Sequence, residues 1–329
     1  MITRLIPASV AERGGWAADI YAGLATLRVP ATRDNVCAVL AVIEQESTYR
    51  ADPTVPGLPA IAWREIDRRA ERAGLPRLLV HGALQLSSPG GRSYSDRIDA
   101  VRSEKELSEI FDDFIGMVPL GNRLFGSLNP VRTGGPMQVS IAFAERHAAA
   151  RPYPYPLGAG RLRSEIFTRR GGLYFGIAHL LDYPADYERA IYRFADFNAG
   201  QYASRNAAFQ SAVSSASGIA LALDGDLVLP DAELQAAGST ERAVRTLGDR
   251  LGMDDAAIRR ALEQERGKDF ERTPLYARVF ALAERAEGRA LPRAIIPRIR
   301  LDSPKITRNL TTEWFATRVD ERYRRCLVR

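Results

Sequence analysis

The sequence predicts a mainly helical protein, and three observations support this fold class. Apolar residues recur three or four positions apart along most of the 329 residues, which is the period of an α-helix. Proline, glycine and capping residues divide these apolar segments into helices of ordinary length. A convincing strand signal is confined to residues 219–229, where two apolar runs flank Asp224-Gly225 and predict one short β-hairpin.

The composition is that of a globular protein. With 46% hydrophobic and 26% charged residues, the chain differs from disordered, collagen-like and coiled-coil proteins. It contains no run of about 18 uncharged apolar residues, so the sequence predicts no transmembrane helix. Two cysteines and three histidines, none of them clustered, argue against zinc, haem and iron–sulfur sites. We therefore expect no metal and no cofactor.

Two helices are predicted before residue 50. The first begins near Trp16 and ends before Pro30. The second has Thr32 as a plausible N-cap and is apolar on all sides over residues 36–43, which is typical of a buried helix. Its polar residues are confined to the C-terminal end, residues 44–47.

The middle of the chain is predicted to contain further helices. One follows Pro59, and Ser103 and Glu106 form a capping-box pair that opens another. A long loop over residues 118–136 then leads to Met137, where the sequence indicates the start of a helix. The remaining predicted helices cover residues 177–181, 187–197, 203–215, 239–251, 254–266, 274–287 and 312–326.

Positive charge is concentrated at the C-terminal end. The whole chain has 46 basic and 40 acidic residues, a net charge of +6, whereas residues 289–329 hold eleven basic and four acidic residues, a charge of +7. Such a surface could meet nucleic acid, an anionic membrane face or an anionic wall polymer, or simply be a solvated helical face. Because no helix-turn-helix or base-stacking motif is present, no nucleic acid is expected as a partner.

The compartment is left open by the sequence. Cys37 and Cys326 could form one disulfide bond in an oxidising compartment, or both could be inert thiols. The first residues show no apolar core of the kind found in signal peptides. Either the protein is cytosolic or an export segment lies outside this sequence.

Glu46 is the candidate catalytic residue. The residues seven, four and three positions before it are Val39, Val42 and Ile43. Its carboxyl group is therefore expected at the end of a helix whose preceding turns are buried. Apolar surroundings disfavour the charged form of a carboxyl group, which lets the acid hold and donate a proton near neutral pH. Glu44 has comparable neighbours, so periodicity does not choose between the two. The plainer interpretation is a helix end that enters solvent.

Three short segments resemble signatures of the lytic transglycosylases. Gln45-Glu46-Ser47 resembles their Gln-Glu-Ser signature, and Gly135-Pro136-Met137-Gln138 resembles their Gly-Leu-Met-Gln segment. Phe197-Asn198-Ala199-Gly200 resembles their Tyr-Asn-Ala-Gly segment. The three occur in the family's order between about residues 32 and 205. The whole chain also resembles an uncharacterised family of proteobacterial envelope lipoproteins, described only as a domain of unknown function.

The resemblance to lytic transglycosylases implies a lysozyme-like helical core with a cleft for glycan strands. The long stretch between Glu46 and Gln138 then implies a large helical insertion at about residues 58–130. We accordingly expect a catalytic domain over residues 1–216. A second region, residues 217–329, is expected to hold the β-hairpin and a basic helical C-terminal extension.

The same resemblance implies a reaction. A peptidoglycan lytic transglycosylase cleaves the β-1,4 bond between N-acetylmuramic acid and N-acetylglucosamine and leaves a 1,6-anhydro ring. Glu46 would first protonate the glycosidic oxygen and then act as base on the muramoyl C6 hydroxyl. Because the attacking hydroxyl belongs to the same sugar, its effective concentration is high and the second carboxylate of an ordinary glycosidase is not needed.

Substrate contacts are implied for the residues around these segments. Gln138 would donate to an acetamido group and Met137 would pack on a sugar face, while Asn198 would orient the glutamate or its substrate. The implied substrate-binding residues are Ser47, Met137, Gln138, Phe197, Asn198 and Tyr202. Core packing is the alternative for Tyr202. Phe197 stands where the family has tyrosine, and its missing hydroxyl favours the alternative of a non-catalytic glycan-binding or scaffold protein.

The implied partners and compartment follow from this substrate. Peptidoglycan glycan strands are the expected partner, and the basic C-terminal region could contact an anionic envelope surface. The expected location is the periplasm, with a tether of the kind that outer-membrane lipoproteins have.

Overall fold

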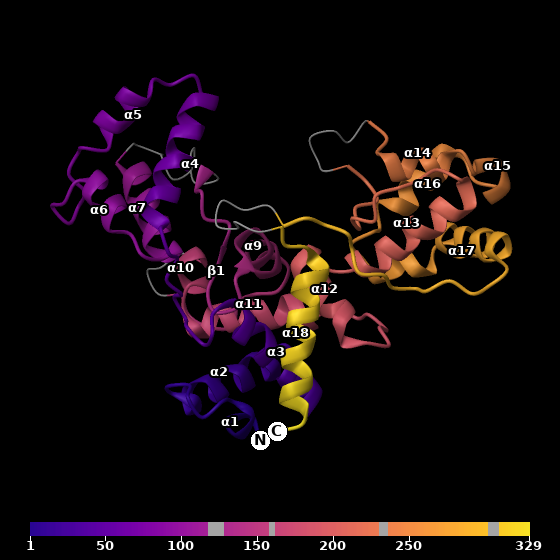
Figure 1. The fold of residues 1–329 in the computed structure, drawn as a ribbon, viewed down its shortest axis with the longest axis horizontal. Helices are drawn as coiled ribbons and strands as arrows, with labels where there is room; N and C mark the ends of the chain where they lie inside the picture. Colours follow the sequence, from indigo (N-terminus) through magenta and orange to yellow (C-terminus); the bar gives the residue numbers. More distant parts are fainter. Residues whose placement is uncertain (118–127, 158–161, 230–235, 302–308) are drawn as a thin grey trace. The chain divides into compact units, whose positions relative to one another are not determined.

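The computed structural model describes residues 1–117, 128–157, 162–229, 236–301 and 309–329 (Figure 1). They are mainly helical, as the sequence predicts. The chain forms two compact units: Met1–Ala31 with Ile43–Ile177, and Thr32–Val42 with Ala178–Arg329. None of the described helices is both long enough and apolar enough to cross a membrane.

The first unit contains short helices and one small sheet. Its elements are α1 (Ile2–Leu5), α2 (Arg13–Thr26), α4 (Leu58–Arg72), α5 (Arg77–Ala83), α6 (Tyr94–Ala100), α7 (Glu104–Gly116), β1 (Thr133–Gly134), β2 (Val139–Ser140), α9 (Ile141–Ala150) and α10 (Leu162–Ile166). Helices α3 (Arg33–Glu46) and α11 (Arg169–Leu181) contribute residues to both units.

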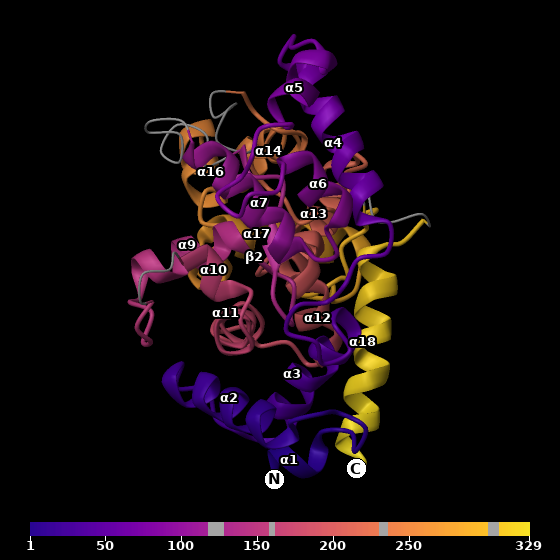
Figure 2. The same ribbon diagram turned by 90° about the vertical axis from the view of Figure 1, so that its left-hand side faces the viewer.

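Helices α4 to α7 form a lobe with a core of its own, which we call the α4–α7 lobe (residues 58–116). Figure 2 shows these helices in purple. Leu58, Tyr94 and Ile110, from three different helices, belong to one buried cluster. The predicted cap of α7 is present, because the hydroxyl of Ser103 accepts a hydrogen bond from the backbone N–H of Glu106 at 3.3 Å.

A two-stranded hairpin replaces the helix start expected at Met137. Strands β1 and β2 are antiparallel, with Thr133 opposite Ser140. The tight turn between them uses Gly135 at φ +74°, where an added Cβ would lie 2.2 Å from the carbonyl oxygen of Ile166. Helix α9 therefore begins only at Ile141, after the chain has turned and paired.

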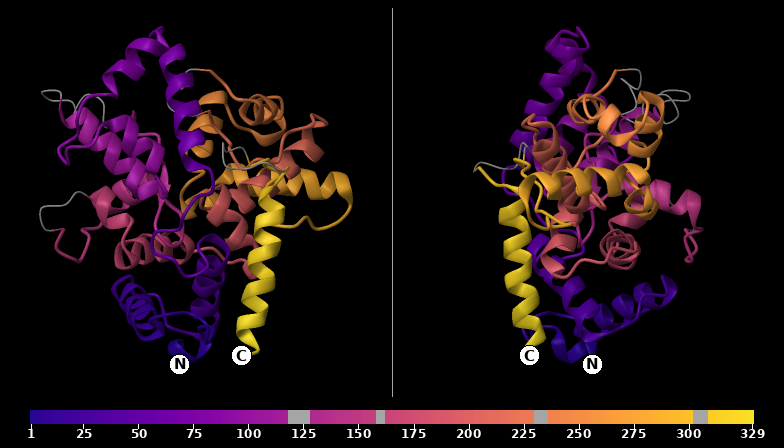
Figure 3. Two further views of the ribbon diagram at one scale, coloured as in Figure 1. Left: turned by 60° about the vertical axis from the view of Figure 1, so that its left-hand side comes forward. Right: turned by 90° about the vertical axis from the view of Figure 1, so that its right-hand side faces the viewer.

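The second unit is helical in its described residues. Its elements are α12 (Ala190–Ala199), α13 (Ala203–Ser217), α14 (Ser239–Arg245), α15 (Gly248–Leu251), α16 (Asp255–Leu262), the 3₁₀ helix η3 (Lys268–Arg272), α17 (Pro274–Glu287) and α18 (Thr312–Leu327). Helix α12 packs against α18, and α13 packs against α17. Both views of Figure 3 show α18 as one uninterrupted helix, in yellow.

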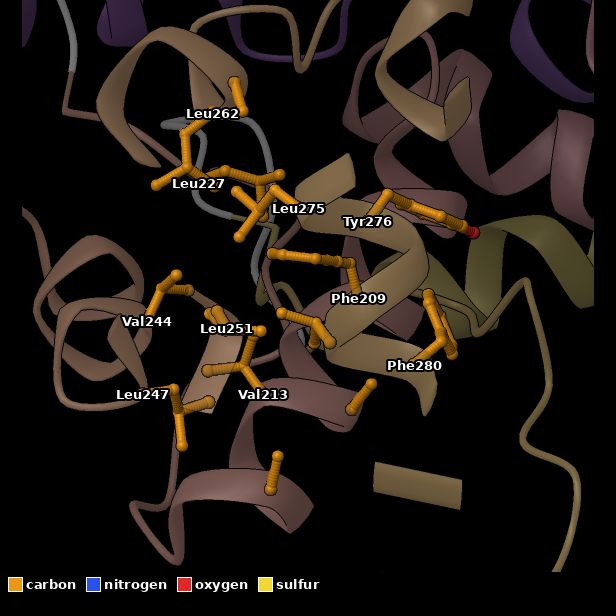
Figure 4. Close-up of a cluster of buried hydrophobic side chains, with 14 of the residues drawn as sticks. Phe209, Val213, Leu227, Val244, Leu247, Leu251, Leu262, Leu275, Tyr276 and Phe280 are labelled. Atoms are coloured by element: carbon orange, nitrogen blue, oxygen red, sulfur yellow. The ribbon is translucent and has the colours of Figure 1, made fainter. Parts of the chain in front are cut away.

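Helices α13 to α17 enclose a large apolar core (Figure 4). At its centre the ring of Phe209 lies 5.1 Å from the ring of Phe270 and is stacked on Tyr276, with ring centroids 5.8 Å apart. Because α13 and the helices that follow it share this core, residue 216, where a domain boundary is expected, lies at the C-terminal end of α13 inside the second unit.

The β-hairpin predicted over residues 219–229 is wrong, because the described structure has no strand there. The backbone N–H groups of this segment donate to buried side chains instead of to a partner strand. Those of Leu227 and Val228 donate to the carboxylate of Glu265, and that of Gly225 donates to the side-chain oxygen of Gln210. Side chains from α13 and from the segment that follows α16 thus satisfy groups that a sheet would otherwise use.

The alternatives left open for the two cysteines are resolved by a disulfide bond. Cys37 in α3 and Cys326 in α18 are bonded, with their Cα atoms 5.5 Å apart. Both residues belong to the second unit, although 289 positions separate them in the sequence.

Candidate functional site

Glu46 is the last residue of α3, as the sequence predicts. All side chains from Val36 to Ile43 are buried, and Glu46 is half-buried. The neighbouring Ser47 explains how the helix ends. Its hydroxyl donates to the carbonyl oxygen of Ile43 at 3.1 Å and accepts from the backbone N–H of Arg50 at 3.3 Å. Ser47 is buried and fixes the end of the helix that carries Glu46.

The two residues after Ser47 have an unusual backbone. Thr48 and Tyr49 have φ angles of +50° and +59°, in the left-handed region that favours glycine. Threonine is β-branched, so this conformation is especially unfavourable for it. Such residues cost about 1–3 kcal/mol each and are concentrated at functional sites. Tyr49 is held by packing, because its ring meets Trp16 edge-on with centroids 5.7 Å apart.

Gln45 contributes a feature that the sequence did not reveal. Its side-chain oxygen Oε1 is buried and has no hydrogen-bond partner among the described residues. Buried acceptors almost always have a donor, so an orphaned one beside Glu46 requires an explanation.

The second motif segment lies in the turn between β1 and β2. The amide nitrogen of Gln138 donates to the carbonyl oxygen of Gly135 at 3.3 Å, and its amide oxygen accepts from the hydroxyl of Thr133 at 3.2 Å. Gln138 is half-buried and also has a left-handed backbone, at φ +49°. Its amide therefore stabilises its own turn.

Met137 does not have the exposed position that the resemblance to lytic transglycosylases implies. The side chain is completely buried, so it offers no surface to a sugar. It packs against α11 at Gly176, where an added Cβ would lie 2.4 Å from the sulfur atom. Met137 instead anchors the turn that carries Gln138.

The third segment ends α12 in the second unit. Phe197 is buried between the rings of His179 and Phe315, at centroid distances of 5.1 and 6.4 Å. His179 Nε2 donates to the carbonyl oxygen of Phe197 at 3.1 Å. Asn198 is exposed, and its side-chain oxygen accepts a 2.8 Å hydrogen bond from the hydroxyl of Thr312. Asn198 is thus the most exposed member of this segment.

Tyr202 is part of the core. Its side chain is buried, its ring meets Tyr183 edge-on with centroids 5.0 Å apart, and the guanidinium of Arg205 lies 4.2 Å from the ring centroid. Burial raises the pKa of the Tyr202 hydroxyl. Core packing, the alternative weighed for this residue, describes its position.

Asp196 organises this region and was missed by the sequence analysis. Its carboxylate is completely buried and accepts from the hydroxyls of Tyr183 and Tyr187 at 3.0 and 2.6 Å. It also accepts from the backbone N–H groups of Tyr202 and Ser204 at 3.0 and 2.6 Å. Burial raises the pKa of Asp196, although the hydrogen bonds from Tyr187 and Ser204 oppose that shift. The sequence does contain a sign of this role, because an acidic residue stands between the apolar residues Ala195 and Phe197.

Left-handed residues other than glycine coincide with the three motif segments. Four of the six among the described residues lie within a segment or at most two positions after it. The six are Glu12, Arg28, Thr48, Tyr49, Gln138 and Tyr202. The segments were recognised by their residue types, so their left-handed backbone is a separate observation.

No metal site is found in the described ranges. No group of three or more histidine, cysteine, aspartate or glutamate residues there could hold an ion.

The family model described as "Protein of unknown function (DUF1615)" matches residues 9–329. The chain belongs to the DUF1615 family. It is 59% identical over 327 residues to the "Uncharacterized protein YaiW" of Escherichia coli (strain K12), a match that covers 99% of this chain and 88% of that protein. No solved structure matches the chain.

Membership in DUF1615 confirms the whole-chain resemblance to a family of unknown function. The matched range contains all three motif segments and both cysteines of the disulfide bond. The resemblance of the DUF1615 chain to lytic transglycosylases stays a hypothesis.

Proposed function

We propose that the protein is a peptidoglycan lytic transglycosylase with a lysozyme-like core, in which Glu46 is the catalytic acid and base. The observation that carries this proposal is the position of Glu46. It is half-buried at the end of a helix that is otherwise buried, and two left-handed residues, Thr48 and Tyr49, follow it closely. A carboxyl group placed between a buried helix and a strained turn suits proton transfer.

In the proposed reaction one carboxyl group serves two steps. Protonated Glu46 donates its proton to the glycosidic oxygen as the bond between that oxygen and muramoyl C1 breaks. The resulting carboxylate then accepts the proton of the C6 hydroxyl of the same sugar while the C6 oxygen bonds to C1. The proton returns to Glu46 and no water is consumed. The closing ring supplies the nucleophile, which removes the need for a second carboxylate.

The other motif residues have supporting roles in this proposal. Ser47 fixes the end of α3 through its bonds to Ile43 and Arg50. Met137 anchors the turn that carries Gln138. Asn198 is the polar side chain of its segment that is exposed to a ligand, and its position is fixed by Thr312.

The disulfide bond supports a location outside the cytosol. Structural disulfides persist in oxidising compartments such as the periplasm and are rare in the reducing cytosol. The bond between Cys37 and Cys326 is therefore consistent with a protein that reaches peptidoglycan. A periplasmic protein tethered as an outer-membrane lipoprotein, with the basic residues of 289–329 against an anionic envelope surface, is part of this proposal.

The experiment is digestion of intact sacculi, with the soluble products analysed by mass spectrometry. Release of 1,6-anhydro-muropeptides is expected from the wild-type protein. Glu46→Gln is expected to lower the rate at least about 100-fold, because general acid–base catalysis contributes that much or more. The matched control is Glu44→Gln, two positions earlier on the same helix, which should retain nearly full activity. Circular dichroism establishes that both variants are folded.

Other product patterns would overturn the proposal in defined ways. Products with ordinary reducing ends would indicate a hydrolase. Equal losses in the Glu44 and Glu46 variants, or full activity of the Glu46 variant, would remove Glu46 from its assigned role.

A non-catalytic glycan-binding or scaffold protein is the second candidate, and two observations favour it. The amide of Gln138 is already engaged by Thr133 and Gly135, and Phe197 lacks the hydroxyl group of the corresponding tyrosine. This candidate predicts that the protein pellets with sacculi without releasing any muropeptide.

A further inference from the structure

Exposed leucines are concentrated at one end of the α4–α7 lobe. Twelve large hydrophobic residues are exposed in the described structure, and four of them lie within residues 75–86. They are Leu75, Leu78, Leu79 and Leu86, with exposed fractions of 52, 84, 67 and 55%. Single exposed leucines are ordinary, whereas a cluster of this kind marks an interaction surface. We call residues 71–86 the leucine tip.

The backbone beneath these leucines is held in place. His81 in α5 lies 2.8 Å from the carboxylate of Asp67 in α4, between its Nε2 and the aspartate Oδ1. The ring of His81 also packs on Trp63 at 4.8 Å. Leu84 is buried in the core of the lobe, and Val80 packs against that core. The exposure of Leu78 and Leu79 is therefore a property of a fixed helix.

The leucine tip protrudes. Residues 71–79 are exposed without interruption, through the turn at Gly74 and into α5. Figures 1 and 2 show α5 at the outer end of the lobe, beyond the end of α4. A protruding apolar end can enter a soft medium, whereas a peptide or small molecule is normally bound in a concave site.

A small excess of positive charge lies beside the exposed leucines. Residues 65–81 contain four arginines, at 68, 69, 72 and 77, and three acidic residues, at 65, 67 and 71, so the segment carries +1. Arg68 and Arg69 pair with Glu65, whereas Arg72 and Arg77 lie within the leucine tip. Arginines beside exposed apolar side chains are the combination that binds at the surface of an anionic bilayer, where the arginines meet headgroups and the leucines enter the acyl region.

The composition argues against a protein partner. Residues 71–86 contain no tryptophan, tyrosine or phenylalanine. Hot spots of protein–protein interfaces are rich in tryptophan, tyrosine and arginine and poor in leucine. Of these enriched types residues 71–86 hold only arginine, and leucine is their commonest residue. We propose that the leucine tip inserts Leu75, Leu78, Leu79 and Leu86 into the surface of a bilayer that contains anionic phospholipid. This contact is separate from the proposed reaction at Glu46 and from the basic C-terminal residues.

The test is sedimentation of the full chain, with its disulfide intact, on vesicles that contain no peptidoglycan. Vesicles of phosphatidylcholine with about one third phosphatidylglycerol are compared with vesicles of phosphatidylcholine alone. Leu78→Gln/Leu79→Gln is expected to lower the partition coefficient at least about tenfold, since membrane binding scales with buried apolar area. The matched control, Tyr21→Gln/Ile219→Gln, replaces two exposed apolar residues outside both the leucine tip and the basic C-terminal region and should bind like the wild type.

A fluorescent label measures insertion directly. The described residues include no free cysteine, so Leu78→Cys introduces a single thiol for an environment-sensitive dye. A blue shift on addition of anionic vesicles, absent when the dye is attached through Ile219→Cys, is the expected result.

Four outcomes would overturn the proposal. They are failure of the wild type to bind vesicles, unchanged binding of the Leu78/Leu79 variant, equal binding to both kinds of vesicle, and conversion of a wild-type dimer into a monomer by that variant. The last would make the tip a contact between copies of this chain, and light scattering would detect it.

Discussion

Tyr187 donates a 2.6 Å hydrogen bond from its hydroxyl group to Oδ2 of Asp196, a carboxylate with no exposed surface. Two hydroxyls and two backbone N–H groups donate to this carboxylate, which presents acceptors only. The arrangement joins the end of α12 to the start of α13, so Asp196 fixes the position of the neighbouring Phe197-Asn198 segment.

Asp196→Asn is therefore expected to destabilise the protein by about 2–4 kcal/mol, because its amide N–H groups would face other donors. Tyr187→Phe removes one hydrogen bond and should cost about 1 kcal/mol. Urea denaturation followed by circular dichroism measures both. The control is Tyr21→Phe on the exposed face of α2, which should change nothing. An asparagine variant as stable as the wild type would mean that the carboxylate does not hold this junction.

Gly176→Ala is expected to lower stability although alanine normally favours a helix. The new Cβ would lie 2.4 Å from the sulfur atom and 2.7 Å from the Cβ of Met137, so either α11 or the turn that carries Met137 must shift. This shift is expected to lower the free energy of unfolding by about 1–3 kcal/mol. Gly14→Ala in α2 meets nothing within 4 Å and serves as the control, with unchanged or slightly higher stability. Thermal unfolding distinguishes these results.

The same contact predicts non-additivity. Met137→Ala removes the sulfur and Cγ atoms that the new Cβ would meet at 2.4 and 3.0 Å, and it leaves the Cβ of residue 137 free to shift. The double variant with Gly176→Ala should therefore be more stable than the sum of the single effects indicates. Strict additivity would show that Met137 does not lie against Gly176.

Loss of the disulfide bond is expected to lower the free energy of unfolding by about 2–5 kcal/mol, because the bond restricts the unfolded chain over a very long loop. The variant is Cys37→Ser/Cys326→Ser, which leaves no thiol at either position. Guanidinium denaturation of this variant should match that of the wild type in a reducing agent. If the wild type unfolds at the same denaturant concentration with and without reductant, the bond contributes nothing to folding.

The helices could be predicted because their start signals are local. The hydroxyls of Thr32, Ser103 and Thr273 each accept from a backbone N–H three residues later, at the starts of α3, α7 and α17. Such bonds depend only on neighbouring residues, so the sequence contains all the necessary information. The buried stem of α3 and the half-buried Glu46 at its end are likewise a consequence of helical periodicity.

The sequence-based predictions failed where the local structure depends on contacts with residues that are distant in the sequence. In residues 219–229, where a hairpin was predicted, Gln210 and Glu265 satisfy the N–H groups of the second half of the segment. Met137 is buried against Gly176 of α11, which lies 39 positions later in the sequence. Asp196 gains its role from donors that only the folded chain brings together. None of these partners is visible from spacing or composition.

The bond between Cys37 and Cys326 also affects what a protease can release. A single cut anywhere between these two positions leaves both fragments covalently attached to each other. Nicking within that 289-residue span would thus go unseen on a non-reducing gel and appear only once the sample is reduced.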